Sequence, residues 1–128
     1  MPKEKQITIL IVEDDTFLAD LYKTKFEMEG LKVLVAYEGE KGLALAKKNN
    51  PDIILLDLIL PKLSGFEILK TLKADAKYRD IPVVLLTNMS QKADVDKGLK
   101  LGADDYLIKA HFMPTEVIEK IKRLVGKQ

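Results

Sequence analysis

Residues 53–60 read IILLDLIL, and this stretch decides the fold. Seven of its eight side chains are apolar, so they do not alternate with polar ones as in a strand that has one face in water. Strands of this kind are typical of a parallel sheet that helices cover on both faces. The one polar residue, Asp57, must be paired, hydrogen-bonded or metal-bound, because burying an isolated carboxylate is costly.

More apolar runs lie on either side of this stretch, and helical patterns separate them. The expected strands cover residues 7–12, 32–36, 53–56, 82–86 and 106–108. The expected helices follow residue 15, cover 40–48, follow residue 65, cover 91–101, and begin at Pro114. This alternation predicts an α/β fold, a doubly wound five-stranded parallel sheet with helices on both faces.

The first of these helices carries Leu18, Leu21, Tyr22 and Phe26 at helical spacing. Asp15 stands just before it, and aspartate is a preferred N-cap because its side chain accepts hydrogen bonds from amides of the first turn. We therefore expect Asp15 to cap the helix and the four apolar side chains to face the core.

The composition restricts both the size and the partners of the protein. A length of 128 residues and a hydrophobic content of 47% indicate a single domain spanning residues 1–128. Lys and Arg number 21 against 20 Asp and Glu, so nothing indicates a nucleic-acid partner. The absence of cysteine excludes disulfides and thiolate zinc sites. Neither a signal peptide nor an apolar run of ~20 residues indicates a membrane, so the cytoplasm is the expected location.

Polar residues stand where the expected strands end. They are Glu13, Asp14, Asp57, Thr87 and Lys109. Taken singly, the first two could be solvated loop residues, Thr87 an ordinary strand residue and Lys109 a surface lysine. The carboxyl ends of parallel strands, however, meet at one edge of the sheet, where ligands bind. Oxygen ligands without His or Cys favour Mg²⁺, and a carboxylate beside a metal ion and a cation can form an aspartyl phosphate.

Four motifs across the chain resemble the receiver domain of bacterial response regulators, a family that includes the chemotaxis receiver. They are ILIVEDD at 9–15, IILLDLILPKLSG at 53–65, PVVLLTN at 82–88 and GADDYLIKA at 102–110. Each motif alone is weak, but their order and spacing together are specific. The resemblance implies a flavodoxin-like fold with strand order 2-1-3-4-5.

The resemblance also implies a role for each acidic residue. Asp57 would be the phosphoacceptor, and Asp14 would be a direct Mg²⁺ ligand. Glu13 would act on the metal through water, and the backbone carbonyl of Ile59 would complete the metal site. Mg²⁺ is therefore the expected cofactor.

Three further residues would respond to the phosphoryl group. The resemblance implies that Thr87 hydrogen-bonds it, that Lys109 pairs with it, and that Tyr106 is an aromatic switch that turns inward as Thr87 moves. The expected function is thus a signalling switch of a two-component phosphorelay and not an enzyme, although the domain would assist its own phosphorylation and slow dephosphorylation.

The implied partners act before and after this switch. A sensor histidine kinase or a phosphotransfer protein would supply the phosphoryl group. A downstream effector, or a second copy in a homodimer, would bind the face formed by residues 91–101, the strand around Tyr106 and residues 115–125. Charges suited to a weak reciprocal contact lie in this segment: Asp94, Asp96, Asp104, Asp105, Lys97, Lys100, Lys120, Lys122 and Arg123.

One departure from the family pattern leaves an alternative open. The family usually has proline after the lysine, in a cis peptide, whereas Ala110 follows Lys109 here. A cis bond before a non-proline residue costs roughly 2.5–4 kcal/mol, so Lys109 could be aimed differently. The alternative function is a degenerate receiver that acts as a phosphorylation-independent interaction module. We expect a stand-alone receiver, with excision from a longer regulator as the alternative.

Overall fold

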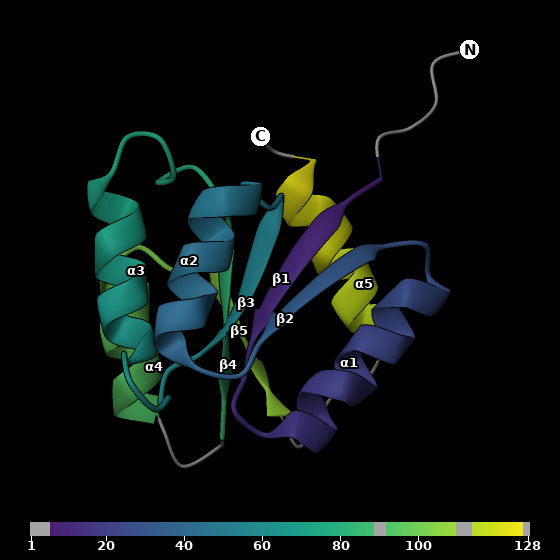
Figure 1. Cartoon of the computed structure of the whole chain (residues 1–128), viewed down its shortest axis with the longest axis horizontal. Coiled ribbons are helices and arrows are strands. Elements are labelled where there is room, and N and C mark those ends of the chain that lie inside the picture. Colours follow the sequence, from purple (N-terminus) through teal and green to yellow (C-terminus); the bar gives the residue numbers. More distant parts are fainter. Residues whose placement is uncertain (1–5, 89–91, 110–113, 127–128) are drawn as a thin grey trace.

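A computed structural model describes residues 6–88, 92–109 and 114–126. Within them, five strands form one parallel sheet in the order β2-β1-β3-β4-β5, which confirms the expected fold class and strand order (Figure 1). The strands are β1 (Thr8–Val12), β2 (Lys32–Ala36), β3 (Ile53–Asp57), β4 (Val83–Thr87) and β5 (Asp105–Ile108). The helices are α1 (Thr16–Met28), α2 (Gly39–Asn49), α3 (Gly65–Ala74), α4 (Lys92–Lys100) and α5 (Pro114–Val125).

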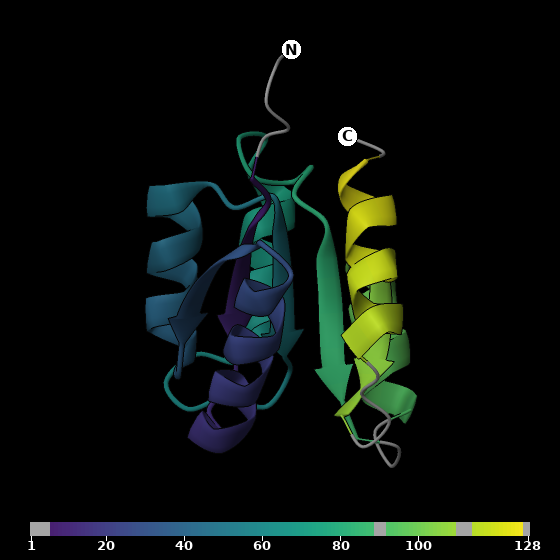
Figure 2. The same ribbon diagram turned by 90° about the vertical axis from the view of Figure 1, so that its right-hand side faces the viewer.

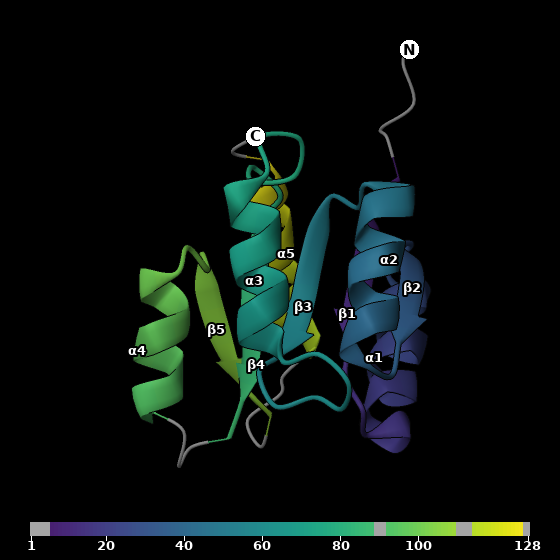
Figure 3. The ribbon, with the colours of Figure 1, turned by 60° about the vertical axis from the view of Figure 1, so that its left-hand side comes forward.

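Helices cover both faces of the sheet. Figure 2 shows α2 and α5 on opposite sides of the strands, and Figure 3 shows α2 and α3 in front of the sheet with α5 behind it. Successive residues of β1 point to opposite faces, so Leu10 and Val12 join the core on the α2 and α3 side, and Ile9 and Ile11 the core on the α1 and α5 side. All four side chains are fully buried, which explains why the strand has no polar face.

Two aspartates bind the backbone at the amino edge of the sheet. Asp52 Oδ2 accepts a hydrogen bond from the Thr8 amide at 2.8 Å, and Asp104 Oδ2 accepts one from the Val83 amide at 2.8 Å. Each bond satisfies a backbone donor at the first residue of a strand. Lys73 Nζ also lies 3.7 Å from Asp104 Oδ2. Asp104 was expected among the charges of the face that binds a downstream partner. Its carboxylate already contacts the Val83 amide and Lys73 within the chain.

One expectation for α1 is wrong. Leu21 was expected to face the core, but its side chain is 38% exposed, whereas Tyr22 and Phe26 are fully buried. The buried residues of α1 are Ala19, Tyr22 and Phe26, which form a narrow stripe. Because each residue advances about 100° around a helix, Leu21 lies beside this stripe and faces solvent. In the parts of the chain that the structure describes, no helix is long and apolar enough to span a membrane.

Gly65, the first residue of α3, allows this helix to approach the end of β3 closely. Its amide donates a hydrogen bond to the carbonyl of Leu58 at 2.9 Å. A Cβ added at Gly65 would overlap the backbone oxygen of Asp57 and lie 2.7 Å from Leu58 Cα. These are backbone atoms, which cannot rotate out of the way as the end of a side chain can. The contact therefore fixes the loop that follows Asp57.

We expect Gly65→Ala to lower the free energy of unfolding by about 1–3 kcal/mol, because the new methyl group overpacks a site bounded by backbone. Gly126→Ala is the matched control, since an added Cβ there would have its nearest neighbour at 3.2 Å. Urea unfolding followed by circular dichroism measures both variants. A Gly65→Ala protein as stable as the wild type would show that the loop can move aside.

Candidate functional site

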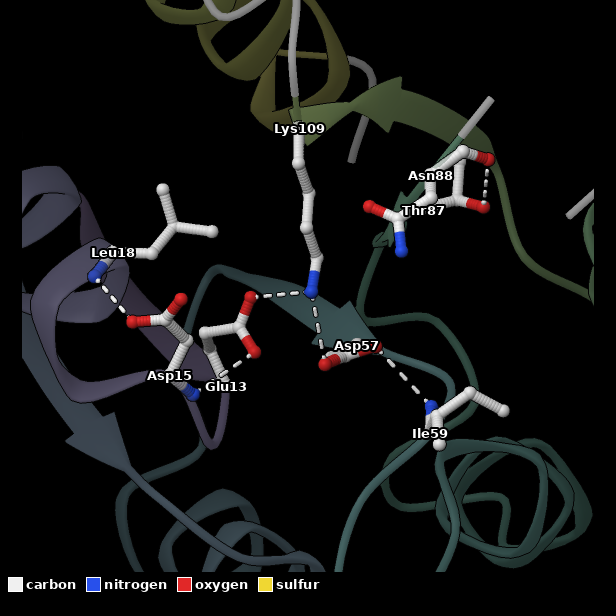
Figure 4. Close-up of polar contacts among 8 residues, drawn as sticks. All are labelled: Glu13, Asp15, Leu18, Asp57, Ile59, Thr87, Asn88 and Lys109. Atoms are coloured by element: carbon white, nitrogen blue, oxygen red, sulfur yellow. Dashed lines mark hydrogen bonds and ion pairs between the residues drawn. The ribbon is translucent and has the colours of Figure 1, made fainter. Parts of the chain in front are cut away.

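The carboxyl ends of four strands, β1, β3, β4 and β5, carry polar residues at one edge of the sheet. Figure 4 shows four of these residues near one another: Glu13, Asp57, Thr87 and Lys109. They come from distant parts of the sequence and meet because all the strands run in the same direction. These side chains therefore gather at the carboxyl edge of the sheet, where the sequence led us to expect them.

Three carboxylates form an acidic cluster at this edge. Glu13, Asp14 and Asp57 each offer an oxygen atom, and these oxygens all lie within 4.8 Å of one another. Glu13 is fully buried and Asp57 is 4% exposed, whereas Asp14 faces solvent. The donor set consists of carboxylate oxygens, which suits a hard divalent cation such as Mg²⁺.

Lys109 reaches this cluster from the end of β5. Its Nζ lies 2.6 Å from Glu13 Oε1 and 3.0 Å from Asp57 Oδ2 (Figure 4). Burial lowers the pKa of Lys109, but the two ion pairs outweigh burial and leave the pKa above its ordinary value. Burial first, and then the neighbouring carboxylate of Asp57, raise the pKa of Glu13 to about 7. The ammonium group of Lys109 therefore forms ion pairs with two buried carboxylates.

Backbone amides hold the buried carboxylates in position. Glu13 Oε2 accepts a hydrogen bond from the Asp15 amide at 3.3 Å, and Asp57 Oδ1 accepts one from the Ile59 amide at 3.2 Å. Asp15 Oδ1 in turn accepts from the Leu18 amide at 3.1 Å, so the expected N-cap of α1 is confirmed. The loops after β1 and β3 thus orient the two acids toward Lys109. The sequence analysis missed the contribution of the Asp15 amide, because backbone donors leave no sequence signal.

For Ile59 and Ala110 the structure gives less information about the expected role. Ile59 contacts Asp57 through its amide, and its expected role as a carbonyl ligand stays a prediction. Its side chain is 57% exposed at the rim. Ala110 lies outside the described residues, and so does the peptide bond that joins it to Lys109.

Thr87 and Tyr106 line a cavity that the sequence analysis did not identify. Thr87 is 1% exposed, and its Oγ1 donates to the Asn88 carbonyl at 3.1 Å (Figure 4). Tyr106 is 41% exposed. The cavity has a volume of about 220 Å³, and its apolar walls include Val95, Leu99 and Ile108. Helical and strand periodicity predicts that the apolar faces of α4 and β5 meet. It does not predict that a gap remains between them.

Comparisons with known proteins identify the family. The response regulator receiver domain, as a family model, matches residues 9–122. The DNA-binding dual master transcriptional regulator RpaA of Synechocystis is 43% identical over 119 residues, which are 93% of this chain and 49% of that protein. The transcriptional regulatory protein CpxR of Klebsiella pneumoniae is 41% identical over 119 residues, again 93% of this chain and 49% of that protein. The chain spans about half the length of these relatives.

Solved structures agree with the family match. A putative response regulator from Chloroflexus aurantiacus has a TM-score of 0.89 and 30% identity, over 95% of this chain and 99% of that chain. The receiver domain of the sensor histidine kinase PA1611 from Pseudomonas aeruginosa has a TM-score of 0.86 and 27% identity, over 95% and 99% of the two chains. That domain has a magnesium ion coordinated in its active site cleft. The present chain therefore belongs to the response regulator receiver domains, the signalling switches of two-component systems.

Proposed function

We propose that this protein accepts a phosphoryl group on Asp57 and changes its surface in response. One observation supports this proposal most directly: Asp57 is a buried carboxylate that lies beside two other acids and pairs with Lys109. Buried ionic groups of this kind contribute little net stability, because desolvation offsets most of their attraction. Their presence at a strand-end edge therefore favours a chemical role.

In the proposed reaction, an oxygen of Asp57 attacks the phosphorus of a phosphohistidine on a sensor histidine kinase or a phosphotransfer protein. The new P–O bond forms as the P–N bond breaks, and the electron pair of the broken bond stays on the imidazole nitrogen. The product is an aspartyl phosphate. Lys109, with Nζ already 3.0 Å from Asp57 Oδ2, is placed to pair with the negative charge of the bound phosphoryl group.

The acidic cluster is proposed to hold Mg²⁺. Asp14 and Asp57 would bind it directly, Glu13 would act through water, and the backbone carbonyl of Ile59 would complete the set. When bound, the ion neutralises charge on the transferring phosphoryl group. The exposure of Asp14 leaves the cluster open to solvent on one side, while burial keeps the other two carboxylates fixed. The magnesium-bound Pseudomonas receiver domain supports this assignment.

Thr87 and Tyr106 are proposed to carry the change from the site to the surface. The Thr87 hydroxyl would leave the Asn88 carbonyl, to which it now donates, and bond to a phosphoryl oxygen instead. Tyr106 would turn into the cavity that it lines with Thr87. Burial of the ring would favour this state, since roughly 25 cal/mol is gained for each Å² of apolar surface removed from water.

The face formed by α4, β5 and α5 is proposed to bind a downstream effector or a second copy of the chain. Lys120 and Asp105 on this face form an ion pair of 3.1 Å within the chain. A partner that uses either charge must compete with this pair. Exposed pairs contribute about 0–1 kcal/mol, so the exchange costs little and the contact weakens as salt rises.

We further propose that residues 1–128 act as a single receiver domain in the cytoplasm, as a switch that assists its own phosphorylation and dephosphorylation and not as an enzyme acting on a separate substrate. DNA binding is named for the relative RpaA, and this chain matches about half of its length. These residues carry a net charge of +1, so no contact of their own with nucleic acid is proposed, and none with a membrane.

The outer side of α1 is proposed as the docking surface for the phosphodonor protein. Phe17, Leu21 and Met28 are 79%, 38% and 75% exposed. At 100° per residue they lie within about 40° of one another, so they form an apolar stripe along the helix. The stripe begins next to the Asp15 cap, and a donor protein that reaches Asp57 passes beside it. A helix of the donor fits such a stripe, because its own side chains recur at the same spacing.

Asp57→Asn is expected to abolish phosphorylation by a phosphohistidine protein or by acetyl phosphate in the presence of Mg²⁺, because an amide is a poor nucleophile. Asp15→Asn is the matched control, since it removes the same charge nearby and asparagine can still cap α1. Mass spectrometry of the intact protein measures incorporation. A phosphorylated Asp57→Asn protein would contradict the assignment, and an unphosphorylated wild type would favour the phosphorylation-independent interaction module.

Asp14→Asn is expected to weaken Mg²⁺ binding by about 10- to 100-fold, because it replaces a charged ligand with a neutral one. Isothermal titration with MgCl₂ measures the affinity without any phosphodonor. Asp15→Asn should bind Mg²⁺ as the wild type does. If both variants keep the wild-type affinity, the ion binds elsewhere.

Phe17→Ser is expected to slow phosphorylation by the phosphohistidine protein about tenfold or more, since burying a large apolar side chain contributes about 1.5–3 kcal/mol. Acetyl phosphate should phosphorylate the variant at the wild-type rate, because so small a donor needs no docking surface. Lys70→Ser, an exposed position on α3, is the control. Equal slowing with both donors would show that Phe17 affects the chemistry or the fold instead of docking.

A further inference from the structure

Helix α4 rests on the sheet through a small contact. Its buried residues are Val95 and Gly98. Gly98 allows the helix to lie close to β4, because an added Cβ there would come within 2.5 Å of Leu85 Cδ1. Figure 3 shows α4 at the outer edge of the molecule, beyond α3. Few buried contacts therefore oppose a sideways movement of this helix.

The cavity of about 220 Å³ lies on one side of α4, between this helix and β5. Val95 and Leu99 of α4 and Tyr106 and Ile108 of β5 line it. Leu99 and Tyr106 are 37% and 41% exposed. If α4 moved toward β5, both side chains would lose contact with water, so the hydrophobic effect favours closure of the cavity.

On its other side, α4 contacts α3 through a cation–π pair. Lys97 Nζ lies 4.5 Å from the centroid of the Phe66 ring, which is within the range of a cation–π interaction. Lys97 lies about 160° around the helix from Val95, at 100° per residue, so it points away from the cavity. Movement of α4 toward β5 would pull Lys97 off the ring.

We infer that the contact between Lys97 and Phe66 is a latch that keeps α4 away from β5 and so sets the resting balance of the switch. The inference rests on the proposed function, in which Tyr106 occupies the cavity in the phosphorylated state. In the closed state, Tyr106 fills the cavity and α4 packs against it from the other side. Releasing the latch raises the resting population of this state. A ligand that binds the closed state preferentially then binds more tightly by the same factor. For a cation–π contact at an exposed position, that factor is about two- to fivefold.

The test uses beryllofluoride, a stable mimic of the phosphoryl group, titrated with Mg²⁺ into the full chain. Lys97→Met and Phe66→Leu are each expected to bind it about two- to fivefold more tightly than the wild type. Both variants remove the cation–π contact, Lys97→Met by removing the charge and Phe66→Leu by removing the ring, and both leave an apolar side chain at the position. Fluorotyrosine NMR reports the state of Tyr106 directly. Its signal in the unliganded variants should shift toward the position seen with beryllofluoride.

Lys100→Met is the matched control, because Lys100 is an exposed lysine in the last turn of the same helix and the charge change is identical. It is expected to bind the mimic as the wild type does, and urea unfolding checks that each variant is folded. Wild-type affinity in Lys97→Met, equal tightening in Lys100→Met, or an unchanged Phe66→Leu would each overturn the latch. Failure of the wild type to bind the mimic is a distinct result, which would refute the proposed role of Asp57 and the latch with it.

Discussion

Two buried carboxylates, Glu13 and Asp57, share the ammonium group of Lys109, and the arrangement of the strands makes this sharing possible. The acids come from β1 and β3, which are neighbours, whereas the lysine follows β5 and must reach across β4. Removing the lysine would take away the ammonium partner of both buried acids, which costs several kcal/mol. This ionic group depends on the strand order, which brings the three side chains together. It also depends on the loop that Gly65 holds and on the backbone amides that orient the two acids.

Much of the fold was predictable because its signals are local. The apolar run 53–60 identifies a doubly covered strand, and Asp15 reveals a helix start, since both depend on neighbouring residues alone. The position of Leu21 was not predictable, because periodicity gives the direction of a face and not the width of its contact. The pairing of Lys109 with Glu13 was also missed, since a strand end locates a side chain but not its rotamer.

The site lies between two surfaces with different properties. The apolar stripe of α1 and the cavity beside α4 are on opposite faces of the sheet, and both begin at its carboxyl edge. A protein that docks on the α1 stripe, as proposed, would approach from the face of the sheet opposite to α4. Thr87 is suited to connect the two surfaces, since it is buried at the end of β4 and also lines the cavity. In the proposed function, arrival of the donor and the response of α4 therefore use different surfaces.

The opposite edge of the sheet has a different physical character, because Asp52 and Asp104 hold the first amides of β1 and β4. A satisfied backbone donor exchanges its hydrogen only when the structure around it opens. Opening is therefore hindered where these two strands begin. The first residues of β1 and β4 are thus tied to the chain by an aspartate side chain as well as by the sheet, which limits fraying at the end of the sheet that lies away from the site.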